Sequence, residues 1–147
     1  MLLRKYMALL GIGAARIDLV LEKETYYPGE LVKGYFLLSG GTIEQELKRI
    51  DCDLVASGPS PGIEQVLDSI TILSSSTIAA GENGKIPVTF RLPAAIGPEH
   101  DQSAFYHFKT KLTFTKGAES MDLDIIKVLQ RKDETLTREE ESIEETL

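Results

Sequence analysis

Apolar and polar residues alternate along most of the middle of this chain, and this pattern constrains the fold more than any other feature of the sequence. In the stretch ARIDLVLEK, Ile17, Leu19 and Leu21 fall on one face while charged residues fall on the other. A period of two indicates a β-strand with one buried face, because successive side chains point to opposite sides of a sheet. The alternation recurs at residues 31–38, 47–57, 85–93 and 106–114, and it ends in 122–130.

The inward faces of these predicted strands follow from the same pattern. Segment 31–38 carries apolar residues on both faces, which predicts a strand more covered than the others. Pro87 has no backbone donor, so the strand at 85–93 is predicted to lie at a sheet edge or to start there. The doubled Ile125–Ile126 predicts a bulge. In the other segments the predicted inward sets are Ile50, Cys52, Leu54 and Ala56; Ile86, Val88, Phe90 and Leu92; and Tyr106, Phe108, Leu112 and Phe114.

Glycine and proline fill the spaces between the alternating segments. The turn signals are YPGE, SGG, SGPSPG, AAGENG and LPAAIGPEH, and no segment between them keeps a helical period. The run Ser74–Thr77 is expected to end one strand or to link two. Short strands separated by such turns are typical of a β-sandwich, so the predicted fold class is all-β, an antiparallel sandwich of immunoglobulin-like type.

One sandwich domain is expected at residues 15–130, with a segment of different composition on either side. Residues 1–14 hold a basic pair and a short apolar run interrupted by glycine, which predicts a short helix and a joint at the domain edge. A cleaved secretion signal is the alternative for this segment. Residues 131–147 are rich in acidic residues and poor in large apolar ones, which predicts an acidic tail, disordered or helical.

Charge and cysteine content exclude several classes of function. The net charge of -7 argues against a nucleic-acid binder and against docking on anionic membranes, both of which need a basic face. The apolar run near the N-terminus is too short to insert through a membrane. The one cysteine, Cys52, allows no internal disulfide and favours a reducing compartment.

The motifs that could serve catalysis or bind a cofactor or metal are weak, so no catalytic residue, no cofactor and no metal ligand is predicted. The GIGAAR stretch lacks the strand before it and the helix after it that dinucleotide binding requires. The triplet Glu99, His100 and Asp101 fits an exposed polar loop better than a metal site. Cys52 lies on an apolar face and is expected to be inert.

The N-terminal third carries an ordered series of short motifs. A glycine joint at 11–13 is followed by a strand ending in LEK at 21–23, by YYPGELVKG, and by Gly40, Gly41, Glu44 and Gln45. Later come AAGENGKIPVTFRLP and a stretch with Asp122 and Asp124 as an acidic pair. In this order the motifs resemble the bacterial sporulation-control family of the SpoOM type.

The resemblance implies an arrestin-like β-sandwich and a cytoplasmic, non-enzymatic regulatory role exerted through protein–protein contacts. Members of the family are usually longer, with two such sandwiches, and this chain spans one. We therefore expect the surface that a second sandwich would cover to be covered by a homodimer, by the acidic tail or by the N-terminal helix.

Loops are the expected sites of partner contact, because binding residues concentrate on them. The candidate interaction residues are Tyr27, Pro28, Gly29, Glu30, Pro59, Pro61, Pro98, Glu99 and His100. A function of another class stays open at this point, namely a secreted or surface sandwich module that binds a small ligand or sugar.

Overall fold

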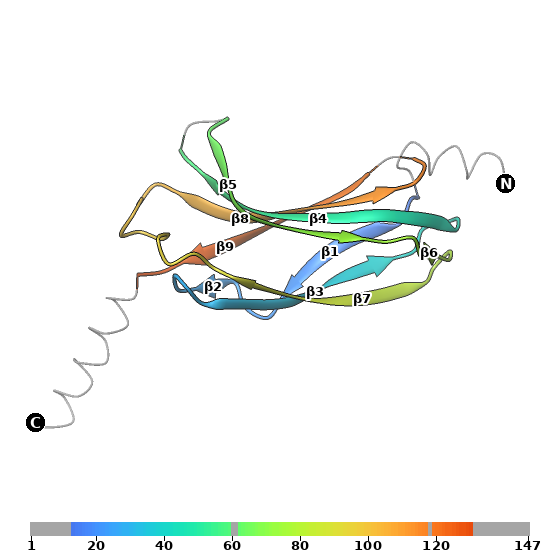
Figure 1. The fold of residues 1–147 in the computed structure, drawn as a ribbon, viewed down its shortest axis with the longest axis horizontal. Helices are drawn as coiled ribbons and strands as arrows, with labels where there is room; N and C mark the ends of the chain where they lie inside the picture. Colours follow the sequence, from blue (N-terminus) through green and yellow to red (C-terminus); the bar gives the residue numbers. More distant parts are fainter. Residues whose placement is uncertain (1–12, 60–61, 118, 131–147) are drawn as a thin grey trace, which may run out of the picture.

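The chain forms two stacked β-sheets, as the alternation predicts. The computed structural model describes residues 13–59, 62–117 and 119–130, and Figure 1 shows the two layers. One sheet has the order β1-β3-β7, and the other has the order β2-β9-β8-β4-β5, with β6 also paired to β4. The strands are β1 (Arg16–Leu21), β2 (Thr25–Tyr26), β3 (Leu31–Ser39), β4 (Gln45–Ser57), β5 (Glu64–Leu73), β6 (Thr77–Ile78), β7 (Asn83–Arg91), β8 (Phe105–Phe114) and β9 (Ser120–Val128).

Among the described strands, the pairing is antiparallel at every ladder except one. Strands β2 and β9 pair in parallel, over Thr25–Tyr26 and Lys127–Val128. The remaining ladders are antiparallel, and the long strand β4 sits between β8 and β5. The prediction of an all-β, antiparallel sandwich is therefore confirmed.

The core lies between the sheets and is made by the inward-facing residues of the alternating segments. Phe90 of β7 and Phe108 of β8 join the two sheets, with ring centroids 4.8 Å apart. Aromatic rings at this separation gain stabilisation beyond their buried area. Of the predicted inward residues, Ile17, Leu19, Ile50, Cys52, Leu54, Val88, Phe90, Leu92, Tyr106, Phe108, Leu112 and Phe114 are buried.

Two expectations for the 85–93 and 31–38 segments have different outcomes. Strand β7 is an edge strand, so the prediction from Pro87 is confirmed. The covering of 31–38 is partial on its outer face, where Leu31 is 39% exposed while Tyr35 and Leu37 are half-buried. The described residues form two sheets and no third layer, and on the outer face of β3 the Lys85 ammonium lies over the Tyr35 ring, 4.7 Å from its centroid.

The predicted bulge at Ile125–Ile126 is wrong. The β8–β9 register runs without a shift, so Ile126 points into the core while Ile125 is 72% exposed. The register shifts lie instead in the β4–β8 ladder, between Leu47 and Arg49, and in the β4–β5 ladder, opposite Leu54/Val55. The doubled isoleucine comes from an apolar residue on the outer face of β9 and not from an extra residue in the strand.

Residues 74–76 link β5 to β6, and Thr77 begins β6, so linking two strands is the one of the two predicted roles that the run has. The N-terminal helix expected at 1–14 falls almost entirely outside the described residues, and the acidic tail expected at 131–147 lies wholly outside them. In the part of the chain that is described, no helix is long and apolar enough to cross a membrane.

Candidate functional site

Two of the loops predicted as interaction sites meet at one end of the sandwich. The turn between β2 and β3 lies against the loop between β7 and β8, where the Gly29 N–H donates to the Pro93 carbonyl at 3.2 Å. The Leu92 N–H donates to the Glu30 carbonyl at 2.9 Å, so the two segments are bonded at two points. The end of β9 joins them through a bond of 2.9 Å from the Leu129 N–H to the Tyr26 carbonyl.

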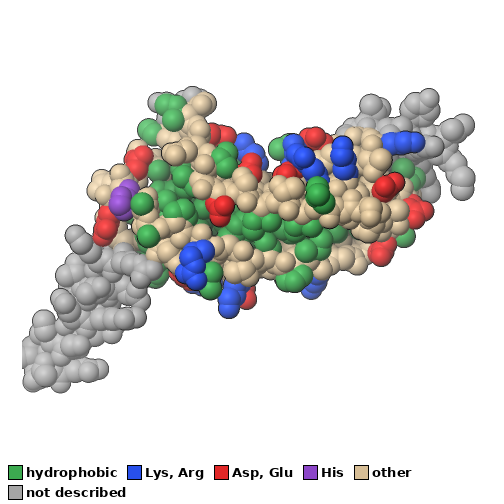
Figure 2. Space-filling view, in the orientation of Figure 1, with side chains coloured by type: hydrophobic (Ala, Val, Ile, Leu, Met, Phe, Trp, Pro, Cys, Tyr) green, Lys and Arg blue, Asp and Glu red, His purple; other side chains and the backbone are tan. Residues whose placement is uncertain are grey.

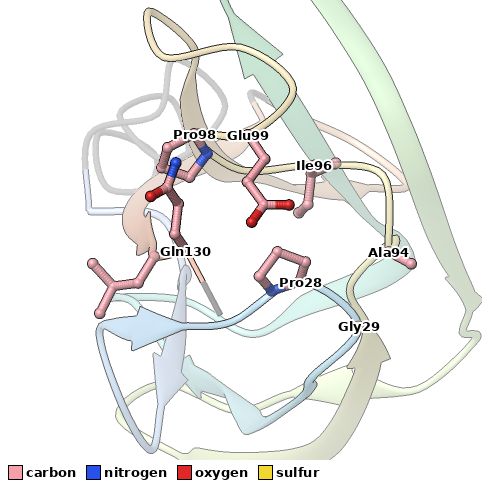
Figure 3. Close-up of a pocket in the computed structure, with 8 residues that line it drawn as sticks. Pro28, Gly29, Ala94, Ile96, Pro98, Glu99 and Gln130 are labelled. Atoms are coloured by element: carbon pink, nitrogen blue, oxygen red, sulfur yellow. The ribbon is translucent and has the colours of Figure 1, made fainter. Parts of the chain in front are cut away.

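These three segments surround a small cavity of about 240 Å³. Its wall is mostly apolar, and Glu99 and Gln130 supply the charged and amide groups. In Figure 3 the Glu99 carboxylate reaches over the space between Pro28 and Pro98. The lining residues are Pro28, Gly29, Ala94, Ile96, Pro98, Glu99, Leu129 and Gln130. We call this region the loop-end cavity.

The turn at Tyr27–Glu30 is fixed by its own residues. The Glu30 N–H donates to the Tyr27 carbonyl at 3.1 Å, and Gly29 has φ of 79°. Proline followed by a residue with positive φ is the pattern of a type II turn, which glycine adopts without strain. The Glu30 carboxylate also accepts a bond of 3.0 Å from the Tyr27 N–H and pairs with the Lys23 ammonium. The turn therefore presents Pro28 in a defined position.

Gly97 lets the loop between β7 and β8 pack closely against the turn between β2 and β3. Its N–H donates to the Tyr106 hydroxyl at 2.9 Å, and its own φ is 102°. A Cβ at this position would lie 3.2 Å from Pro28 Cγ and 3.2 Å from Val128 Cγ1. Both the backbone conformation and the close packing thus require glycine.

We expect Gly97→Ala to destabilise the protein by about 1–3 kcal/mol, because the new methyl group adds crowding to backbone strain. Gly81→Ala is the matched control: Gly81 has φ of 71° and open space around a Cβ, so it reports strain alone. Urea unfolding of both variants measures the difference. Equal losses in the two variants would show that contact with Pro28 and Val128 is unimportant.

The structure places the predicted interaction residues in three groups. Pro28, Gly29, Pro98 and Glu99 line the cavity, and Tyr27 and Glu30 shape the turn beside it. His100 is exposed in the same loop, where its N–H donates to the Gly97 carbonyl at 3.0 Å. Pro59 is exposed in the β4–β5 hairpin and does not line the cavity, and Pro61 lies outside the described residues. Ala94, Ile96, Leu129 and Gln130 complete the cavity and were not predicted.

A cluster of carboxylates lies elsewhere, at the corner where β1 meets β9. Oxygen atoms of Asp18, Asp122 and Asp124 all lie within 4.8 Å of one another. Asp122 accepts a bond of 2.8 Å from the Leu19 N–H, and the Ser120 hydroxyl accepts one of 3.2 Å from the Ile17 N–H. These side chains therefore satisfy backbone donors along the free edge of β1.

The protonation states at this corner differ from one carboxyl group to the next. Burial and the neighbouring Asp122 and Asp18 raise the pKa of Asp124 to about 8. Burial alone would raise the pKa of Asp122, but hydrogen bonds from Asp124 and the Leu19 N–H hold it below its usual value. Burial and the adjacent Asp122 raise the pKa of Asp18. Asp124 is thus protonated at neutral pH and shares its proton with Asp122.

Carboxylate oxygens are ligands that Ca²⁺ and Mg²⁺ prefer, and the three carboxylates lie close enough together to bind one ion. No metal ligand was predicted from the sequence, and Asp122 and Asp124 were noted only as an acidic pair. Asp18 could not be added to them from sequence alone, because it is 104 positions before Asp122 in the chain and reaches it only when the two sheets close. The bond that the structure shows at this cluster is the one from the Leu19 N–H to Asp122, which covers a backbone donor on the β1 edge.

Two further reactive side chains, Cys52 and His107, are buried. Cys52 is a buried free thiol that accepts a bond of 3.3 Å from the Thr110 hydroxyl, and burial raises its pKa to about 11. The thiol therefore stays protonated and unreactive. His107 is buried, and in the sheet register it lies between Val55 of β4 and Ile125 of β9; burial lowers its pKa.

Comparison with known proteins identifies what this chain resembles. A model of the family described as "SpoOM protein" matches residues 3–135. The sporulation-control protein Spo0M of Bacillus subtilis (strain 168) is 38% identical over 96 residues, which cover 61% of this chain and 37% of that protein. The crystal structure of Spo0M from Bacillus subtilis superposes with a TM-score of 0.70 at 31% identity, covering 80% of this chain and 50% of that one. The matched region thus spans half or less of these relatives.

Proposed function

Because this chain belongs to the SpoOM protein family, we propose that it is a non-enzymatic regulatory protein that binds other proteins through the loop-end cavity. The observation that carries the proposal is the meeting of two separate loops around an apolar space. Loops held by a rigid sandwich are a common location of binding residues. A regulatory role is supported by the similarity to a protein named for sporulation control.

The size and lining of the cavity favour a protein partner over a small ligand. A volume of about 240 Å³ is below the range usual for pockets that enclose drug-sized molecules, and it fits a single apolar side chain. No aromatic residue is among the described residues that line it, so it offers no stacking surface for a sugar ring. The small-ligand alternative has therefore no support from this cavity.

The same lining does not favour catalysis. Glu99 is the one titratable side chain among the described lining residues, whereas nucleophilic or acid–base catalysis uses paired groups within hydrogen-bond reach. We further propose a cytoplasmic location, supported by the buried free thiol of Cys52. The homodimer expected from the resemblance stays a prediction, which light scattering on the full chain tests.

Charge reversal at the cavity mouth tests the binding site. We expect Glu99→Lys to weaken capture of the partner by tenfold or more, since it places an ammonium over the apolar opening; tenfold corresponds to about 1.4 kcal/mol. The measurement is quantitative in-cell crosslinking of the tagged chain, with the captured protein identified by mass spectrometry.

Glu44→Lys is the matched control for that experiment. Glu44 is exposed in the β3–β4 connection, at the opposite end of the sandwich, and the substitution changes the charge equally. The proposal predicts that Glu44→Lys retains the partner. Equal capture by the wild-type chain and by both variants would rule out the loop-end cavity as the binding site.

A further inference from the structure

The edges of the two sheets differ in how they are protected against pairing with another strand. Side chains of Ser120 and Asp122 occupy backbone donors on the free edge of β1. Strand β7 carries Pro87 near its middle and Lys85 beside it, which are both residues that discourage strand pairing. Strand β2 has only 2 residues. Strand β9 pairs with β2 over only two residues, but the rest of its outer edge faces β1, whose Ile17 and Leu19 N–H groups bond to its side chains. Strand β6 has only 2 residues. Among the described strands, β5 therefore has the longest edge without such protection.

Strand β5 offers a long free edge. It has 10 residues, none of them proline, lysine or arginine, and its one neighbour in the sheet order is β4. The register shift beside Leu67 gives β5 an extra residue, so regular pairing runs from Asp68 to Leu73. A long edge without proline, lysine or arginine is open to strand addition. The bulge at Leu67 protects only one end of it.

The alternation along the strand shows which N–H and C=O groups of β5 point toward β4 and which point away from it. The Ser74 N–H donates to the Lys48 carbonyl of β4 at 3.0 Å, so the N–H groups of Ser69, Thr71 and Leu73 point away from β4, because directions alternate along an antiparallel strand. The Ser69 N–H donates to the Asp68 carboxylate at 2.9 Å, so this donor is already used. Thr71 and Leu73 therefore present both donor and acceptor outward, to an incoming strand.

Apolar side chains accompany this edge. Ile70 and Ile72 of β5 and Ile86 of β7 are only partly buried, although they pack against the core. Figure 2 shows hydrophobic side chains along this flank, between β5 and β7 as placed in Figure 1. Leu73, at the end of β5, is 77% exposed. A strand added here would cover Ile70 and Ile72 with its own inward side chains.

The charge of the edge selects the kind of partner. Strand β5 carries Glu64 and Asp68 and no basic residue. Asp68, and Asp53 on the adjacent strand, make no ion pair within the described residues, whereas Glu64 pairs with Lys109 at 3.1 Å. A second copy of β5 would add carboxylates and no cation, so a basic strand complements this edge better.

We propose that the β5 edge binds an extended, basic segment of a partner protein by strand addition, with apolar residues at alternate positions covering Ile70 and Ile72. Main-chain bonds to Thr71 and Leu73 would give affinity, and the side chains would give specificity. This surface is separate from the loop-end cavity, so the two proposals can fail independently.

The test uses the full chain and a synthetic peptide of about ten residues, the length of a typical strand, in which lysine and valine alternate. A shuffled peptide of the same composition with its valines together is the control for charge alone. Fluorescence anisotropy is expected to show that only the alternating peptide binds, with at least tenfold preference over the shuffled one. Glu99→Lys should leave this binding unchanged, which separates the β5 edge from the loop-end cavity.

Two substitutions at Thr71 identify the edge. Thr71→Pro removes an outward N–H and leaves the backbone bonds to β4 in place, so the alternating peptide should bind at least tenfold more weakly. It also removes the bond of 3.0 Å from the Thr71 hydroxyl to Asp51 of β4, which Thr71→Val removes equally. Thr71→Val keeps the N–H and the β-branched shape, and binding should change less than twofold. Thermal unfolding verifies that both variants fold.

Amide hydrogen exchange on the wild-type chain gives a readout that does not depend on the proline variant. The peptide is expected to slow exchange at Thr71 and Leu73. The proposal is overturned if neither peptide binds, if both bind equally, if Thr71→Pro binds as well as wild type, or if exchange at these amides is unchanged. It is also overturned if light scattering shows a dimer that Thr71→Pro converts to a monomer, since a second copy would then occupy the edge.

Discussion

Asp124→Asn is expected to stabilise the protein at alkaline pH and to leave its stability almost unchanged in acid. The folded-state pKa of Asp124 is about 8, above its ordinary value of 3.8. Below about pH 4 both folded and unfolded chains are protonated there, so the residue makes no difference. As the pH rises from 4 to 8, the unfolded chain releases the proton while the folded chain retains it, and stability falls.

Asparagine stays neutral in both states, so the variant lacks that decline. The gain should appear between pH 4 and 8 and level off above 8, at about 1–3 kcal/mol once solvent screening of this partly buried group is allowed for. The measurement is urea unfolding at pH 4, 6, 7.5 and 9, intervals chosen to bracket the pKa of about 8.

Asp122→Asn is the control and has the opposite sign. The pKa of Asp122 lies below its usual value, so its ionised form stabilises the folded chain above that value, and this stability is lost as the pH falls through the folded pKa. The variant should be less stable than wild type at neutral pH and equal to it in strong acid. Parallel stability profiles for Asp124→Asn and wild type would contradict the proton sharing described at this corner.

Phe108→Ala is expected to cost about 3–5 kcal/mol, the loss typical of a buried aromatic residue. Phe108 is fully buried and packs on Phe90 of the opposite sheet, so its removal leaves a cavity between the layers. Phe105→Ala is the matched control on the same strand, because Phe105 is 62% exposed and its loss should cost about 0.5 kcal/mol or less.

Denaturant unfolding measures both phenylalanine variants. A small effect at Phe108, or similar effects at both positions, would mean that β8 does not face the core as described. The double variant Phe90→Ala/Phe108→Ala should lose less than the sum of the single losses, since the two rings contact each other.

The sequence predicted the strands whose alternation is regular and one-sided. Ile50, Cys52 and Leu54 are buried as the pattern requires, and the position of Pro87 marked an edge. Strand β5 was not predicted, because it is exposed along most of its length and the extra residue at Leu67 shifts its phase. The alternation of apolar and polar residues is therefore interrupted in β5, the strand to which we propose that a partner strand binds.

The candidate site was predicted in its parts but not as a unit. Pro28 and Gly29 define a turn from local chemistry alone, and Pro98 and Glu99 belong to a loop with similar signals. Their meeting depends on bonds such as Gly29 N–H to the Pro93 carbonyl, which join residues far apart in the chain. Long-range contacts of this kind leave no local pattern, as the carboxylate corner at Asp18 also shows.

The central claim, that the protein acts by binding a partner at the loop-end cavity, is tested most directly by amide hydrogen exchange. The full chain is compared alone and in complex with the partner captured in the cell. We predict slower exchange at residues 27–30 and 94–99, because partner contact excludes water from those amides. Protection confined to the opposite end, at residues 40–44 and 115–117, with the loop-end amides unchanged, would contradict the claim.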